Sequence, residues 1–251
     1  MIQILSTIDE LRDFRKSCKG QIGFVPTMGA LHEGHATLLR TARDECDSVI
    51  LSIFVNPTQF NDPTDLDKYP RTFETDKLLA IDEKVDAIFY PQASDLYADD
   101  FVYEVQEKKW SKKFCGAHRK GHFEGVLTIV LRLFNLVKPD FAYFGEKDFQ
   151  QLNLIRGMVS AFFLDLKIVP VPIVRESDGL AMSSRNVRLT PEDRKKAPLF
   201  FKILNSAPSA DEAKSQLESE GFTVEYVEDW QGRRLGAIQL GSVRLIDNVE
   251  C

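Results

Sequence analysis

The chain has 251 residues, 43% of them hydrophobic and 28% charged, and its 38 acidic and 32 basic side chains give a net charge of −6. This balance is ordinary for a globular protein. It excludes disordered and fibrous classes, and also a basic nucleic-acid-binding surface over the whole chain. The longest nearly apolar stretch, residues 125–137, is too short to span a bilayer; the absence of a secretory-signal pattern and the four scattered cysteines predict a cytoplasmic location.

Short β-rich runs alternate with helical stretches through the first 171 residues. Strands are predicted over residues 21–25, 48–55, 86–90, 141–144 and 167–171, and helices over residues 35–46, the second half of 65–83, 125–137 and 148–162. Buried strands that alternate with helices predict an α/β fold with a doubly wound parallel sheet. Ligands of such a sheet lie beyond the carboxyl ends of its strands.

The sequence pattern changes after residue 171, where prolines and the turn 177–179 (SDG) interrupt the alternation. Two helical segments, 191–204 and 209–220, and two β-like runs, 223–227 and 243–247, follow. We therefore expect a first domain over residues 1–173 and a small α+β lid domain over residues 174–251.

The strongest motif is the segment 26–35, PTMGALHEGH, which joins the first predicted strand to the first predicted helix. Its glycines permit tight backbone paths, and the start of the helix offers N–H groups and a positive dipole end to an anion. Two histidines three residues apart can donate hydrogen bonds to a phosphate that gains charge in a transition state. The alternative is a pair of histidines satisfied within the turn.

A second polar loop, residues 181–186 (AMSSRN), lies far downstream, after the SDG turn. The HEGH of the first motif resembles the HxGH signature of nucleotidylyltransferases, whose second half is a mobile KMSKS-like loop. Two hydroxyls and a guanidinium suit a triphosphate, because Arg can bind phosphate oxygens in a bidentate way. The alternative is a polar loop without a ligand.

Further polar residues follow other predicted strands. Asn56 and Gln59 come after the second strand, and their amides can recognise hydroxyl and carboxylate groups, although Asn-Pro also favours a plain turn. Lys147 follows a later strand and is a candidate phosphate ligand, while Asp148 either caps the next helix or binds a ribose hydroxyl.

These segments together resemble the pantothenate synthetase (pantoate–β-alanine ligase) family. The strings that carry the resemblance are FVPTMGALHEGH, FVNPTQF, YPRT, FCGAHRKGHFEGV, KPDFAYFGEKDFQQL, DGLAMSSRN and RLIDN, which together extend over residues 24–248. The resemblance implies a Rossmann-like sheet of the HxGH type, and a homodimer that transfers AMP from ATP to (R)-pantoate, releases pyrophosphate, and then joins the pantoyl group to β-alanine.

The resemblance also implies the site residues. The ATP site would comprise Met28, Gly29, Ala30, Leu31, His32, Glu33, Gly34, His35, Gly145, Glu146, Lys147, Asp148, Val174, Met182, Ser183, Ser184 and Arg185. Pantoate and β-alanine would contact Met28, Asn56, Gln59 and Gln151. The catalytic residues among these would be His35, His32, Lys147 and Arg185, with Arg119 and His122 as supporting residues.

Magnesium is expected with ATP, mostly on phosphate oxygens, and Asp76 is the candidate protein contact; the alternative is a solvated acid on a surface helix. The spacing of a zinc half-site occurs at Cys115, His118 and His122, but no second ligand pair lies nearby in the sequence.

The tail after Asn186 is about 65 residues, shorter than is typical of the family. A shorter lid domain excludes water less completely, so we expect some hydrolysis of the reactive pantoyl adenylate, the intermediate that the resemblance implies.

Two other functions compete with the ligase. A nucleotidyltransferase with a phosphate acceptor would be expected to use Arg or Lys where this chain has Gln59 and Gln151. A non-catalytic nucleotide- or RNA-binding protein on the same fold would be expected to lose the HxGH motif or the Ser-Ser-Arg loop, yet both are intact.

Overall fold

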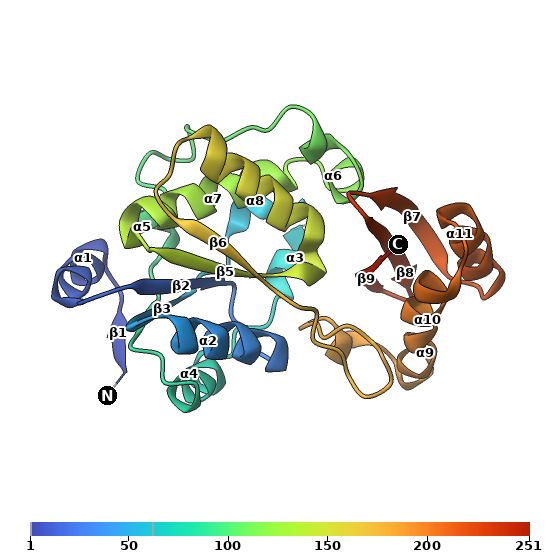
Figure 1. The fold of residues 1–251 in the computed structure, drawn as a ribbon, viewed down its shortest axis with the longest axis horizontal. Helices are drawn as coiled ribbons and strands as arrows, with labels where there is room; N and C mark the ends of the chain where they lie inside the picture. Colours follow the sequence, from blue (N-terminus) through green and yellow to red (C-terminus); the bar gives the residue numbers. More distant parts are fainter. Residues whose placement is uncertain (1, 62) are drawn as a thin grey trace. The chain divides into compact units, whose positions relative to one another are not determined.

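The computed structural model describes residues 2–61 and 63–251, which form two compact units (Figure 1). The first unit comprises the residues up to Gly145 together with Gln151–Val171, and the second comprises Glu146–Gln150 and Pro172–Cys251. The short segment after Gly145 therefore groups with the C-terminal residues, although its neighbours on both sides belong to the first unit. No helix among the described residues is long and apolar enough to cross a membrane.

The first unit is built around a six-stranded parallel sheet. Its elements are β1 (Gln3–Leu5), α1 (Ile8–Ser17), β2 (Ile22–Thr27), α2 (Glu33–Glu45), β3 (Ser48–Ile53), the 3-10 helix η1 (Pro57–Gln59), α3 (Pro63–Asp67), α4 (Phe73–Asp82), β4 (Ala87–Phe89), α5 (Ala93–Leu96), η2 (Trp110–Lys112), α6 (Cys115–His118), α7 (His122–Val137), β5 (Phe141–Gly145), α8 (Phe149–Ala161) and β6 (Lys167–Val171). The strand order is β1-β4-β3-β2-β5-β6, with every pairing parallel. The predicted doubly wound parallel sheet is confirmed.

The strand order explains where ligands bind in this unit. The chain runs from β2 outward through β3 to β4, and later returns to the other side of β2 with β5 and β6. Helices α2 and α4 cover one face of the sheet and α7 and α8 the other, as Figure 1 shows. The order reverses between β2 and β5, and α/β sheets bind ligands at such a point, beyond the carboxyl ends of the strands. The loop after β2 is therefore in the expected place for a nucleotide site.

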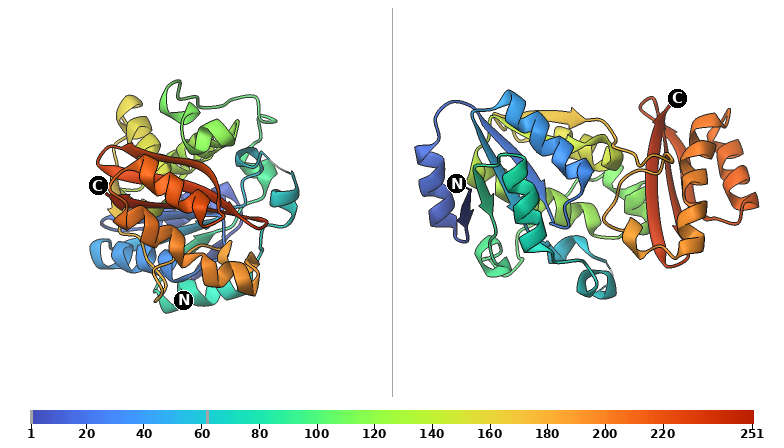
Figure 2. Two further views of the ribbon diagram at one scale, coloured as in Figure 1. Left: turned by 90° about the vertical axis from the view of Figure 1, so that its right-hand side faces the viewer. Right: turned by 90° about the horizontal axis from the view of Figure 1, so that it is seen from below.

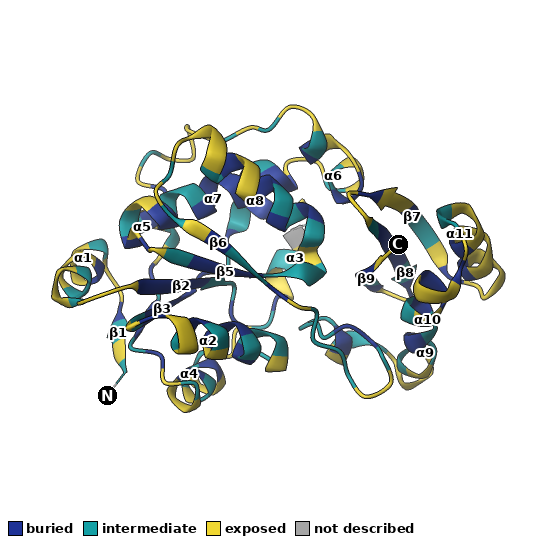
Figure 3. Ribbon diagram, in the orientation of Figure 1, coloured by how far each residue is buried: buried dark blue, intermediate teal, exposed yellow. Residues whose placement is uncertain are grey.

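The core of the first unit lies on both faces of this sheet. The central strands β2 and β3 are largely buried, as the dark blue in Figure 3 shows, whereas the edge strands β1 and β6 are partly exposed. Val25, Leu39, Leu51 and Ile88 are fully buried in one cluster, between the sheet and its covering helices. Because both faces are covered, the strands are continuous apolar runs and not alternating ones.

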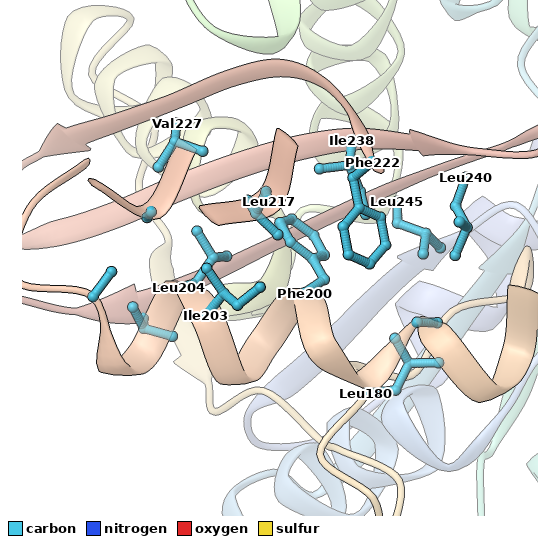
Figure 4. Close-up of a cluster of buried hydrophobic side chains, with 14 of the residues drawn as sticks. Leu180, Phe200, Ile203, Leu204, Leu217, Phe222, Val227, Ile238, Leu240 and Leu245 are labelled. Atoms are coloured by element: carbon cyan, nitrogen blue, oxygen red, sulfur yellow. The ribbon is translucent and has the colours of Figure 1, made fainter. Parts of the chain in front are cut away.

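The second unit contains an antiparallel sheet with helices on one face (Figure 2). Its elements are η3 (Glu146–Asp148), η4 (Asn186–Arg188), α9 (Pro191–Lys196), α10 (Pro198–Ser206), α11 (Ala210–Ser219), β7 (Thr223–Trp230), β8 (Arg233–Leu240) and β9 (Val243–Glu250). Phe200, Leu204 and Leu217 from the helices pack against Ile238 and Leu245 of the sheet (Figure 4).

Several predicted elements differ from the structure. The helix predicted over residues 191–204 is two helices, α9 and α10, because Pro198 begins the second one. The sequence does not predict strand β8, because its first residues are two arginines and Ile238 is its one β-branched residue. A Cβ atom at Gly236 would lie 3.0 Å from Phe200, so the helix packs directly on the strand backbone there. The N-terminal β1 and α1 were also not predicted.

Candidate active site

The loop between β2 and α2 has an unusual backbone. Gly29 has a φ of +81° and Ala30 a φ of +51°, so two successive residues are left-handed. This conformation costs an alanine more than a glycine, so other contacts must hold the loop in place. The side chain of His32 caps the start of α2.

Each histidine of the motif accepts a backbone hydrogen bond through its own Nδ1 atom. Nδ1 of His32 accepts from the N–H of Gly34 at 3.1 Å, and Nδ1 of His35 accepts from the N–H of His32 at 3.3 Å. A neutral imidazole that accepts at Nδ1 carries its proton on Nε2. The two rings lie side by side, with centroids 4.2 Å apart. The turn thus fixes the tautomer of both histidines, with each Nε2 a hydrogen-bond donor.

Asp76, from the first turns of α4, holds this loop. Its carboxylate accepts from the backbone N–H of Ala30 at 3.0 Å and of Leu31 at 2.8 Å, and from the hydroxyl of Thr72 at 3.1 Å. The residue is 1% exposed, so the alternative of a solvated surface acid is wrong. These three donors offset the cost of burying the carboxylate. The predicted ion contact of Asp76 stays a prediction.

A cavity of about 200 Å³ adjoins the loop at the carboxyl ends of β2, β3 and β4. Met28 and Gly29 form part of its wall, with Arg71 from the YPRT segment and Gln92 from the loop after β4. The cavity shows that this edge of the sheet is hollowed beside the loop 28–35, as the doubly wound topology predicts.

The amide of Gln59 has a fixed orientation beside this loop. Its Oε1 accepts from Nδ2 of Asn56 at 3.1 Å, so its Nε2 lies on the other side, 3.0 Å from the sulfur of Met28. Asn56 is 1% exposed; its Nδ2 also donates to the carbonyl of Gly125, and its Oδ1 accepts from Thr58 and from Tyr97. The side chain of Asn56 therefore uses all its hydrogen-bonding capacity within the protein. Gln59 uses one N–H on the sulfur of Met28, which leaves the second N–H of its amide as a further donor.

Two further residues fix the backbone of Gln59. The ring of His122 lies 2.8 Å from the carbonyl oxygen of Gln59, and Arg119 donates to the same oxygen at 3.4 Å. Arg119 also lies 3.0 Å from Nε2 of His122. Burial raises the pKa of Tyr97, so its phenol stays protonated and can donate to Asn56. No local sequence pattern indicates Tyr97, because only the folded chain brings it to this network.

The first turns of α7 pack on η1 with no room for a side chain. A Cβ atom at Gly125 would lie 2.5 Å from the carbonyl oxygen of Thr58 and 2.7 Å from the backbone nitrogen of Gln59. Both are backbone atoms that cannot move alone, so any larger residue displaces the turn that holds Gln59.

We therefore expect Gly125→Ala to lower the free energy of unfolding by about 1–3 kcal/mol through overpacking, and to raise the KM for the substrate that Gln59 is predicted to bind. Gly157→Ala is the matched control, because Gly157 is also in a helix and a Cβ there meets nothing within 4 Å. That control is expected to stabilise the protein by about 0.5–1 kcal/mol. Urea denaturation and steady-state kinetics of both variants check the prediction; equal effects would contradict it.

The possible zinc half-site gains no support from the geometry. Among the residues that the structure describes, no group of three or more His, Cys, Asp or Glu could hold a metal ion. The ring of His122 is instead directed at the carbonyl of Gln59.

The remaining predicted ATP residues lie in the second unit, apart from Gly145. Lys147 is in the short helix η3, and its ammonium lies 3.9 Å from a carboxylate oxygen of Asp148. In the downstream loop, the carbonyl of Val174 accepts from the N–H of Met182 at 3.0 Å. The hydroxyl of Ser183 accepts from the N–H of Arg185 at 3.2 Å.

The structure thus places the predicted residues in two groups. Met28, Asn56 and Gln59 form one contact network in the first unit, beside the loop 28–35. Gln151 is half-buried in the first turn of α8, also in the first unit. Lys147 and the loop 183–185 share the second unit.

Comparison with known proteins identifies the family that the chain resembles. The family model for pantoate-beta-alanine ligase matches residues 3–250. A pantothenate synthetase of Bdellovibrio bacteriovorus is 57% identical over 250 residues, covering 100% of both chains, and one of Legionella pneumophila is 50% identical, covering 98% of this chain and 99% of its own. Since the match covers 100% of both chains, the Bdellovibrio protein has the same short tail. The hydrolysis of adenylate expected from this short tail stays a prediction.

A solved structure is similar over the whole chain. The crystal structure of pantoate-beta-alanine ligase from Francisella tularensis, complexed with beta-gamma ATP and beta-alanine, has a TM-score of 0.95 and 39% identity, and covers 100% of this chain and 98% of its own. The pantothenate synthetase of Thermus thermophilus has a TM-score of 0.91 at 40% identity, covering 99% of each chain. The chain belongs to the pantoate-beta-alanine ligase family.

Proposed function

We propose that this protein is an AMP-forming ligase that uses ATP to condense (R)-pantoate with β-alanine to pantothenate. In the first step a carboxylate oxygen of pantoate attacks the α-phosphorus, and the bond from that phosphorus to the pyrophosphate oxygen breaks. In the second step the amine of β-alanine attacks the pantoyl carbonyl, loses a proton and displaces AMP. Family membership supports this assignment, and the observation that carries it is the pair of histidines with both Nε2 protons fixed at the nucleotide loop.

Different residues are assigned to the α-phosphate and to the outer phosphates of ATP. Negative charge grows on the phosphate oxygens as pyrophosphate leaves, and the Nε2–H groups of His32 and His35 are donors suited to it. The N-terminal end of α2 adds a favourable dipole. Lys147 and Arg185, with the hydroxyls of Ser183 and Ser184, are assigned to the outer phosphates, as the resemblance implies.

Pantoate is assigned to Gln59 and Gln151. Its carboxylate and hydroxyl oxygens can accept hydrogen bonds, and the fixed amide of Gln59 offers its second N–H without adding charge. A carboxylate held by an amide forms no ion pair with it that must be broken when the carboxylate attacks. This favours a carboxylate acceptor over the phosphate acceptor of other nucleotidyltransferases.

We expect Gln59→Glu to raise the KM for (R)-pantoate by about 10- to 100-fold, because a second carboxylate would face the substrate. The KM for ATP should change much less. Initial-rate kinetics with each substrate varied in turn separate the two effects. An equal rise in both KM values would mean that the substitution disturbs the site generally.

Magnesium enters this proposal as part of the substrate, MgATP. The described residues provide no cluster of metal ligands, and both oxygens of Asp76 already accept hydrogen bonds from the protein. An ion that bridges phosphate oxygens and keeps several waters needs few protein ligands.

Two broader assignments complete the proposal. We place the protein in the cytoplasm, on the reasoning from its scattered cysteines. A homodimer is expected from the resemblance, and the exposed apolar run Phe101, Val102 and Tyr103 is the surface that we assign to it. Sedimentation equilibrium tests the dimer directly.

Pyrophosphate release from MgATP tests the activity, measured alone, with (R)-pantoate, and then with β-alanine added. Release that requires pantoate, with multiple turnovers and pantothenate only when β-alanine is present, is the expected result. Release with a phosphate acceptor in place of pantoate would identify another nucleotidyltransferase. ATP binding without release under any condition would identify a binding protein.

A further inference from the structure

Two successive buried residues of β9, Asp247 and Asn248, contact Arg175 before the loop 183–185 and the backbone of Lys147, in the two segments of the second unit that are assigned to phosphate. Nδ2 of Asn248 donates to the carbonyl oxygens of Glu146 at 2.9 Å and Lys147 at 3.1 Å. Oδ1 of Asn248 accepts from Nη1 of Arg233 at 2.8 Å, and Nη2 of the same arginine binds the carboxylate of Glu146 at 2.8 Å. Asn248, Arg233 and Glu146 thus form a closed set of hydrogen bonds next to Lys147, whose carbonyl oxygen Asn248 also binds.

Asp247 makes the corresponding contact with the downstream loop. Its two carboxylate oxygens accept from the guanidinium of Arg175 at 2.7 and 2.9 Å, a bidentate pair. Arg175 in turn donates to the carbonyl of Gly179 at 3.1 Å, and its backbone pairs with Ala181. Ser183 to Arg185 follow two residues later. The base of their loop is therefore attached to Asp247.

The burial of these two residues makes the attachment rigid. Asp247 is 3% exposed and Asn248 is 1% exposed, and β9 is paired along its whole length with β8. A side chain that is buried and bonded at every polar atom has one arrangement, whereas Lys147 and Arg185 have long side chains whose direction depends on their backbone. Fixing both backbones to neighbouring residues of one strand fixes them relative to each other.

We propose that Asp247 and Asn248 are positioning residues that hold Lys147 and the loop 183–185 on one support within the second unit. The inference rests on the proposed function, since it presumes that Lys147 and Arg185 bind the phosphates of ATP. Neither Asp247 nor Asn248 is assigned a contact with substrate. Each acts through the backbone of the segment that it holds.

A double-mutant cycle on Lys147 and Asn248 tests the proposal, with the Kd of a non-hydrolysable ATP analogue measured by calorimetry. We expect Lys147→Ala and Asn248→Ala each to weaken binding by about 10-fold, and the double variant to be weaker by about 10- to 20-fold rather than 100-fold, because both remove the same contact. Asn248→Asp, which keeps the acceptor for Arg233 but loses both donors, should weaken binding as Asn248→Ala does. Because aspartate is nearly the size of asparagine, Asn248→Asp tests the loss of the donors without leaving a cavity.

Arg234→Met is the control for lost stability alone. Arg234 is 5% exposed in the neighbouring strand β8, and it holds Asp229 and the carbonyl of Ala207, away from both phosphate-binding segments. It should lower the melting temperature and leave the Kd of the analogue unchanged.

The outcomes separate the inference from the function on which it rests. The positioning role alone would be overturned if the effects of the two substitutions on the Kd multiplied in the double variant. It would also be overturned if folded Asn248→Ala bound the analogue with full affinity while Lys147→Ala bound it more weakly. Full affinity in Lys147→Ala would overturn the proposed phosphate contact, and the positioning role with it. The same cycle with Asp247→Asn and Arg185→Ala should show the same non-additivity for the downstream loop.

Discussion

Replacing His35 by Asn should lower the rate of pantoate-dependent pyrophosphate release by about 10²- to 10³-fold, the usual effect of removing one donor to a developing oxyanion. The asparagine amide oxygen takes the place of Nδ1 and can still accept from the N–H of His32, so the turn is kept. What is lost is the donor at the position of Nε2. The variant therefore separates the catalytic role of His35 from its role in the turn.

His35→Gln is the matched variant, because its longer side chain places an N–H group near the position of Nε2. It should recover part of the rate, while His35→Asn and His35→Gln should bind the ATP analogue with similar Kd values. Single-turnover measurements of pyrophosphate release at saturating ATP provide the comparison. A rate within a few-fold of the wild type in His35→Asn would show that the histidines only build the turn.

Local patterns in the sequence were enough to predict the loop between β2 and α2 and the parallel sheet. The loop 26–35 combines a strand end, two glycines and a helix start within ten residues, and its chemistry depends on those neighbours. The strands were predicted because burial on both faces makes them continuously apolar. Neither inference needs to know which distant segments meet.

The residues that hold the site could not be predicted in this way. Asp76 contacts a backbone 45 residues earlier, and Asn248 contacts one more than 100 residues earlier. In the sequence, Asp76 is an ordinary acid in the first turns of a helix and Asn248 an ordinary polar residue near a strand end. Their burial, and the donors that offset it, arise only when the chain is folded. The sequence pattern therefore suggests a metal ion for Asp76, the usual partner of an acid near a nucleotide.

Asp76→Asn is the second substitution with a large expected effect, because it leaves the loop with one acceptor too few. An asparagine of the same shape can accept from Ala30 or from Leu31, but its NH₂ group then faces the other backbone N–H. One buried donor left unpaired costs about 1–3 kcal/mol of stability. The left-handed backbone at Ala30 and Leu31 after it are then held by one acceptor instead of two, and displacement of a catalytic group by about 1 Å can cost about 100-fold in rate. We therefore expect kcat/KM for ATP to fall by about 100-fold.

Two comparisons decide whether Asp76 acts on the loop. Asp86→Asn is the control in the same unit: Asp86 accepts from the N–H of Val49 at 2.7 Å and pairs with Arg43, so its loss should lower stability but leave the KM for ATP unchanged. A magnesium titration distinguishes the two roles of Asp76. If the carboxylate bound the ion, excess Mg²⁺ would restore much of the activity of Asp76→Asn, since a weakened ion site can be filled by mass action. If it holds the backbone, added Mg²⁺ restores nothing, because no ion can replace an acceptor for two N–H groups.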